Sequence, residues 1–86
     1  MKKEHVLMVA GNLISGQRAE DYGNLEDNFG RIAAMWTVIL DKDVSTEQVA
    51  LCMASVKICR LVTTPTHEDS WVDLAGYAAI GGELSE

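Results

Sequence analysis

The apolar residues of this chain recur three and four positions apart, and no run alternates cleanly between apolar and polar residues. The first spacing marks one face of a helix, and the second pattern is what a half-buried strand would need. The 86 residues also contain a single proline, Pro65, so little in the chain interrupts helices. The pattern predicts an all-α fold, and we expect one compact domain of four helices over residues 1–86.

Helix-breaking and helix-capping residues set the expected boundaries. Gly16, Pro65 and the glycine pair Gly81-Gly82 are expected to end helices, as is the polar run 41–43. Three pairs with N-cap spacing mark helix starts: Asn24 with Asp27, Ser45 with Gln48, and Thr66 with Asp69. The expected helices cover residues 3–14, 25–40, 46–62 and 67–80.

The third expected helix is apolar almost all the way round, so we interpret it as the central, most buried one. Cys52 and Cys59 lie two helical turns apart on it, about 10.5 Å, which is too far for a disulfide. No zinc-type Cys/His spacing occurs. The cysteines are therefore interpreted as small core residues of a cytoplasmic protein.

Charge excludes several classes of partner. Seven Lys and Arg against thirteen Asp and Glu give a net charge of −6, which argues against binding a nucleic acid polymer or an anionic membrane. No stretch of apolar residues is long enough to span a bilayer. Because so short a chain has a thin core, we expect a homo-oligomer.

The fourth expected helix has two distinct faces. Asp69, Asp73 and Tyr77 follow one another at one-turn intervals on its polar face. Two carboxylates in this arrangement could hold Mg²⁺; alternatively, Asp69 caps the helix and Asp73 is solvated or pairs with a cation. The opposite face, which we expect to pack in the core, carries Trp71, Leu74, Ala75 and Ala78.

Two cations stand out on the third expected helix. Lys57 and Arg60 lie three positions apart on a helix that is otherwise nearly apolar. They could pair with Asp69 or Asp73, or bind a phosphate, for which the planar arginine fork is well suited. The alternative is a solvated cationic edge.

A third cluster lies between the first two expected helices. Arg18, Asp21 and Tyr22 precede a helix N-terminus, and Asn28 follows in its first turns. The arginine could pair with a phosphate and the tyrosine could stack on a base, with the helix dipole favouring the negative charge. Alternatively, Tyr22 packs over the end of the bundle and Asn28 fixes the loop.

Three phrases together resemble a family of small phage- and prophage-encoded helical proteins of unassigned function. They are the R-x-x-D-Y-G…N-F…W phrase over residues 18–36, the K-x-x-R at 57–60 and the D-S-W-x-D-L-A-G-Y at 69–77. The resemblance covers residues 10–82. It implies a helical fold and, for a phage protein, a location in the host cell cytoplasm.

The fourth helix is also distantly similar to the E-x-x-D helix of all-α nucleoside triphosphate pyrophosphohydrolases of the MazG and dUTPase type. Those enzymes hold Mg²⁺ on a triphosphate. Asp73 matches the second acid, while Ser70 stands at the first with Asp69 beside it. The companion E-E-x-x-E motif has no full match, and Glu20 or Asp21 would complete the metal shell.

The first hypothesis is a phage-type protein that binds, and sequesters, a phosphorylated nucleotide or a nucleotide-derived, cyclic signal. The alternative is a Mg²⁺-dependent nucleotide pyrophosphohydrolase with Asp69 and Asp73 as metal ligands. A third class is an acidic protein-interaction module. The expected ligand-binding residues are Arg18, Asp21, Tyr22, Asn28, Lys57, Arg60, Asp73 and Tyr77.

Overall fold

The computed structural model describes residues 1–16 and 23–86, and these residues form four helices and no strand. The helices are α1 (Lys3–Ser15), α3 (Leu25–Leu40), α4 (Thr46–Thr63) and α5 (Glu68–Leu84). The prediction of an all-α domain with four helices is confirmed, and three of the four predicted helices agree with the structure to within a residue at each end.

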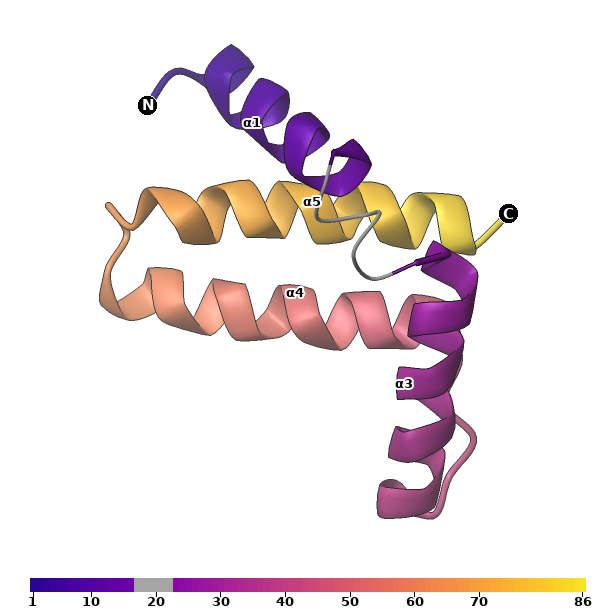
Figure 1. The fold of residues 1–86 in the computed structure, drawn as a ribbon. Coiled ribbons are helices and arrows are strands. Elements are labelled where there is room, and N and C mark those ends of the chain that lie inside the picture. Colours follow the sequence, from indigo (N-terminus) through magenta and orange to yellow (C-terminus); the bar gives the residue numbers. More distant parts are fainter. Residues whose placement is uncertain (17–22) are drawn as a thin grey trace.

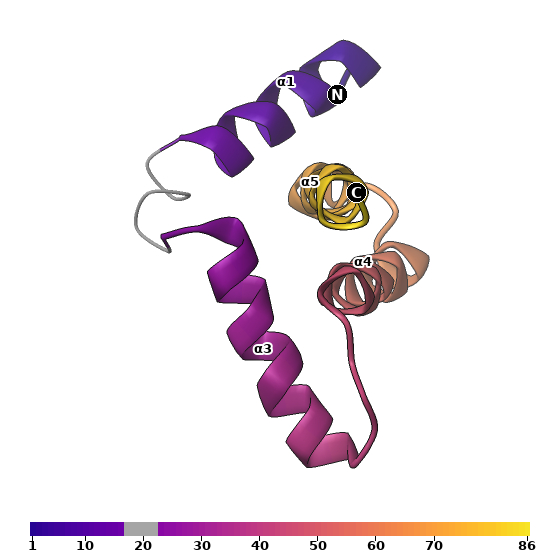
Figure 2. The ribbon, with the colours of Figure 1, turned by 90° about the vertical axis from the view of Figure 1, so that its right-hand side faces the viewer.

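A hairpin of α4 and α5 is the centre of the molecule. The two helices run antiparallel, with α1 across the outer side of α5 and α3 beside the start of α4 (Figure 1). The axis of α3 is close to perpendicular to α4, so the molecule is L-shaped in Figure 1. In the view turned by 90°, α1 and α3 lie on one side of the hairpin (Figure 2).

The predicted caps form at two helix starts. The Asn24 side chain accepts a hydrogen bond from the Asp27 amide at 3.2 Å. Ser45 and Gln48 make a reciprocal capping box, with distances of 3.3 Å and 2.9 Å. Each cap satisfies amides that the first helical turn leaves without partners.

The predicted cap at Thr66 is wrong by one residue. His67 is the N-cap of α5, and its Nδ1 accepts the Ser70 amide at 3.3 Å and lies 2.7 Å from the Ser70 hydroxyl oxygen. This pairing explains how a hydroxyl on a residue that is only 1% exposed finds a partner.

The predicted end of α5 at Gly81-Gly82 is also wrong, because the helix continues to Leu84. A glycine inside a helix costs about 1 kcal/mol relative to alanine, which packing can offset. At Gly81 a Cβ atom would lie 3.4 Å from the Ala50 Cβ of α4. The small residue therefore lets α5 approach α4 closely at this point.

The core is small and lies where α3 meets the hairpin. Phe29 and Ala33 of α3 cluster with Val49 and Ala50 of α4. These four residues are between 0% and 6% exposed. Partly buried side chains extend the cluster: Leu25, Ile32, Trp36, Val44, Met53, Tyr77, Ile80 and Leu84.

Residues 46–62, predicted to form the most buried helix, are no more buried than α5, since each of the two helices has three buried residues. Only Val49, Ala50 and Leu61 of α4 are buried, and Cys52 and Cys59 are exposed rather than in the core. The physical reason is that α4 packs mainly against α5, along one side, and against α3 only near its start. Its opposite side, although apolar, has no described helix against it.

The expected core face of α5 is wrong as well. Ser70, Val72 and Gly76 are buried, whereas Trp71 is 45% exposed and its indole N–H donates to the Pro65 carbonyl at 2.9 Å. Because α5 lies between α1 and α4, small residues face its neighbours. A Cβ atom on Gly76 would lie 3.4 Å from a methyl carbon of Ile14.

None of the described helices combines the length and the apolarity that a membrane-spanning helix needs.

Candidate functional site

A pocket of about 500 Å³ lies where all four helices meet. This volume falls within the range of roughly 300–1,000 Å³ that is usual for small-molecule sites. Its wall combines apolar side chains with a few polar groups, as such sites commonly do. The polar side chains are those of Asn28, Lys57, Asp73, Tyr77 and Glu83.

The apolar part of the wall comes mainly from α1, α3 and α5. On each of these helices the apolar residues of the wall are spaced so that their side chains lie on one face, which is directed at the pocket. They include Leu13 and Ile14 of α1, Leu25, Phe29 and Ile32 of α3, and Val72 and Ile80 of α5.

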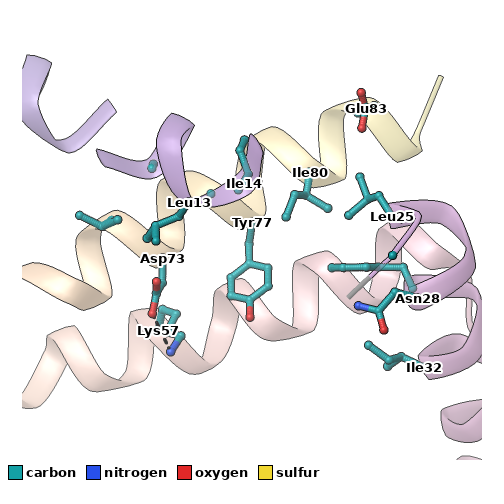
Figure 3. A pocket seen from close by; sticks show the side chains of 15 residues that line it. Leu13, Ile14, Leu25, Asn28, Ile32, Lys57, Asp73, Tyr77, Ile80 and Glu83 are labelled. Atoms are coloured by element: carbon teal, nitrogen blue, oxygen red, sulfur yellow. Dashed lines mark ion pairs between the residues drawn. The ribbon is translucent and has the colours of Figure 1, made fainter. Parts of the chain in front are cut away.

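An ion pair across the hairpin forms one end of the pocket. The Lys57 ammonium nitrogen lies 3.0 Å from an Asp73 carboxylate oxygen, and the two side chains are 15% and 30% exposed (Figure 3). Of the alternatives left open for Lys57 by the sequence, the structure shows the ion pair with Asp73. At this end of the pocket the two charges therefore neutralise each other.

Tyr77 and Asn28 bring an aromatic ring and an amide to the same pocket. In Figure 3, Tyr77 extends from α5 with its hydroxyl directed toward α4, and Asn28 comes from α3 at the other side of the view. Both side chains are partly buried. An aromatic face with amide donors and acceptors is suited to a planar, heterocyclic group.

Glu83, which was not among the residues predicted from the sequence, also lines the pocket. Its signal was the spacing Asp73, Tyr77, Ile80, Glu83, with intervals of four, three and three, which continues one helix face. Ending the helix at Gly81 removed Glu83 from consideration. With Glu83 included, the described wall carries one cation and two carboxylates.

Asp69 does not line this pocket; it lies in the first turn of α5 and is exposed. Among residues 1–16 and 23–86, no group of three or more His, Cys, Asp or Glu side chains is placed to hold a metal ion. Asp73 is instead paired with Lys57. The described residues thus offer Mg²⁺ no ready ligand set, and a magnesium site at Asp69 and Asp73 stays a prediction.

Arg60 is exposed and lines a second hollow, near the turn between α4 and α5, rather than the pocket of Lys57. Arg18, Asp21 and Tyr22, together with Glu20, lie outside the described residues. The pocket wall does include described residues on either side of that segment.

Comparison with known proteins identifies relatives in phages. Residues 5–85 match the family described as a domain of unknown function, DUF6378. The chain is 40% identical over 76 residues to the gene 55 protein of Mycobacterium phage L5, which covers 87% of this chain and 49% of that protein. It is 41% identical over 75 residues to the gene 55 protein of Mycobacterium phage D29, covering 87% of this chain and 50% of that protein.

The chain spans about half the length of the curated relatives it matches. No solved structure matches it. The resemblance to phage proteins of unassigned function is confirmed, and the one to pyrophosphohydrolases stays a prediction.

Proposed function

The chain belongs to the DUF6378 family, whose function is unassigned, and we propose that it binds a nucleotide-derived ligand of low charge in the pocket at the helix junction. One observation carries this proposal. Asn28, Lys57, Asp73 and Tyr77 were chosen from the sequence as ligand-binding residues on three different helices, and all four line the same pocket.

Each of these side chains has a role in such a site. The Tyr77 ring stacks on the base, which fits the apolar wall around it. The Asn28 amide has both donors and acceptors for the base edge. Lys57 contacts a phosphate oxygen, and Asp73 accepts a hydrogen bond from a sugar hydroxyl while it keeps Lys57 oriented.

The charge of the wall favours some nucleotides over others. One cation and two carboxylates would repel the several negative charges of a triphosphate at close range. A phosphodiester carries a single charge for each phosphate, so a cyclic nucleotide suits this wall better. Arg18, as expected from the sequence, would add a second cation.

We place this binding in the cytoplasm of the host cell, because the relatives are phage proteins. A protein that binds a cyclic nucleotide tightly and does not convert it would sequester a host signal. The proposal includes assembly as a homo-oligomer, which a thin core of this size favours.

The test exposes the purified protein, with and without Mg²⁺, to a pool of nucleoside mono-, di- and triphosphates and cyclic di- and trinucleotides. Mass spectrometry then identifies what the protein retains and what remains in solution. We expect an intact cyclic nucleotide in the retained fraction, and none with Lys57→Ala.

Arg60→Ala is the matched control, since it removes a cation from the same helix outside the pocket, and we expect it to retain the ligand. Conversion of triphosphates to monophosphates would instead establish the pyrophosphohydrolase alternative. If nothing is retained or converted, the binding proposal is wrong and the acidic interaction module gains support.

A further inference from the structure

The side of α4 opposite its buried residues is apolar, uncharged and exposed. Leu51, Ile58 and Val62 are 67%, 50% and 80% exposed. With Ser55 between them they follow at intervals of four, three and four, the spacing by which one helix packs along another. The surface formed by these residues and both cysteines is called the α4 face: Leu51, Cys52, Ser55, Ile58, Cys59 and Val62.

Nothing in the described part of the chain covers the α4 face. In Figure 1 and Figure 2 no helix lies along the side of α4 that points away from α5. The contacts of α3 with α4 are near the start of α4, around Val49 and Ala50. The C-terminal half of α3 extends past the hairpin, and Met35, Val38 and Ile39 on it are 59%, 77% and 69% exposed.

The solvent-accessible surface of the chain is larger than expected for a folded monomer of its mass. The chain has an accessible surface of 6117 Å², against about 5,000 Å² expected for a folded monomer of its mass of 9.4 kDa. The excess of about 1,100 Å² resembles the roughly 800 Å² that each partner buries in a standard interface. The radius of gyration is 13.5 Å, against about 12 Å for a compact chain of this length.

We propose that the α4 face docks a second copy of this chain in a two-fold symmetric dimer. A two-fold interface places the same surface against itself. For a chain of net charge −6, contact through a surface without charges avoids like-charge repulsion at the interface. The α4 face has none, and in the proposed dimer the docked copy also covers the exposed apolar residues in the C-terminal half of α3.

Another class of partner fits this surface less well. A basic host protein would be recognised through acidic groups, and the α4 face offers none for steering or selection. The dimer rests on the proposed function in one respect: the proposed function includes a homo-oligomer, and the α4 face is the surface through which it forms. Ligand binding in the pocket is a separate property.

The first test measures mass by light scattering over a wide range of protein concentrations. We expect the wild type to reach twice 9.4 kDa, and Leu51→Asp to remain at the monomer mass. Leu7→Asp is the matched control, because Leu7 on α1 is 68% exposed and Leu51 is 67% exposed. A wild type that is monomeric throughout, or equal loss of the dimer in both variants, would overturn the proposal.

A second measurement uses the wild type alone and so does not depend on whether a variant folds. Cys52 and Cys59 lie on the α4 face, and their rate of labelling by a maleimide should fall about tenfold once nine in ten chains are paired. A labelling rate that is independent of protein concentration would overturn the dimer. Nucleotide retention by the same samples separates the two proposals: a monomer that retains its ligand contradicts the dimer only, and a dimer that retains nothing contradicts the binding site only.

Discussion

The ammonium nitrogen of Lys57 lies 3.0 Å from a carboxylate oxygen of Asp73, and the contact joins α4 to α5 at the wall of the pocket. The two side chains remain 15% and 30% exposed, so water screens their attraction only in part. We expect a coupling energy of about 1 kcal/mol from the double-mutant cycle of Lys57→Ala and Asp73→Ala. Denaturant unfolding of the four proteins measures it.

Lys42→Ala supplies the control, because Lys42 is exposed in the turn after α3. In a cycle with Asp73→Ala it should give no coupling. Equal coupling for both lysines would mean that Asp73 senses the net charge of the chain rather than the ion pair.

Tyr77 offers the sharpest test of how a base would bind. Stacking of a base on an aromatic ring contributes about 1–3 kcal/mol, so Tyr77→Ala should weaken retention of a nucleotide by about 5- to 150-fold. Trp71→Ala removes an aromatic residue from the same helix, but Trp71 is not part of the pocket wall, and affinity should stay unchanged. Isothermal titration calorimetry measures both; equal losses would show that stability, not stacking, is responsible.

The Ser45 capping box should be measurable as stability of the whole domain. Ser45→Ala removes the acceptor of the Gln48 amide and should cost about 1 kcal/mol, equivalent to a fall in Tm of roughly 4–8 °C for a domain of this size. Thermal unfolding followed by circular dichroism checks this. Ser85→Ala, at the exposed end of the chain, is the matched control and should leave Tm nearly unchanged.

The two glycines near the end of α5 should respond in opposite ways to larger residues. Gly82 has open space around its Cβ position, so Gly82→Ala should stabilise the domain by about 0.5–1 kcal/mol. Gly81 faces Ala50, and Gly81→Leu should destabilise it by about 1–3 kcal/mol through overpacking. Chemical denaturation compares the two, and a neutral Gly81→Leu would contradict the close approach of α4 and α5.

Lowering the pH should destabilise the start of α4, and protonation of Glu47 should account for part of this loss of stability. Hydrogen bonds from its own backbone amide and from the Ser45 side chain lower the pKa of Glu47 below its ordinary value of 4.5. The pKa of Glu47 is lower in the folded chain than in the unfolded chain, so the ionised carboxylate stabilises the fold at pH values above the unfolded pKa. This stabilisation is lost as the pH falls through the folded pKa. Glu47→Gln should therefore flatten the acid limb of Tm against pH, whereas Glu86→Gln at the exposed C-terminus should not.

Helix starts and ends were largely predictable because their signals are local. The Ser45–Gln48 and Asn24–Asp27 pairs need only the backbone of one turn, and both form. The end of α5 was not predictable in this way, because a glycine normally marks a helix end. At that point α5 lies against α4, with Gly81 beside Ala50, a neighbour distant in sequence that local signals do not reveal.

The face of α5 that packs inward was the least predictable feature. Hydrophobicity placed Trp71 in the core, yet the buried residues of α5 include the small residues Ser70 and Gly76. The burial of α4 was overestimated as well. An apolar helix face in a sequence does not show whether another part of the same chain packs against it. A sequence reveals which residues share a face, but not which face meets a neighbour.

The candidate site was partly predictable, since charge and aromatic groups on helical faces are visible without coordinates. An ion pair of Lys57 with Asp73 was one of the alternatives that the sequence left open, and it forms. Arg60, only three positions from Lys57, lies at a different hollow, because side chains three positions apart on a helix point about 60° apart.

The order of the helices along the chain has a consequence for synthesis. During translation, α1 and α3 leave the ribosome first, but α1 packs on α5 and α3 packs on α4. α3 gains its partner once α4 has emerged, about one to five seconds later at ordinary elongation rates, whereas α1 has to wait for α5, which follows α4. The packing of α1 on α5 therefore forms later in the synthesis of residues 1–86 than the packing of α3 on α4.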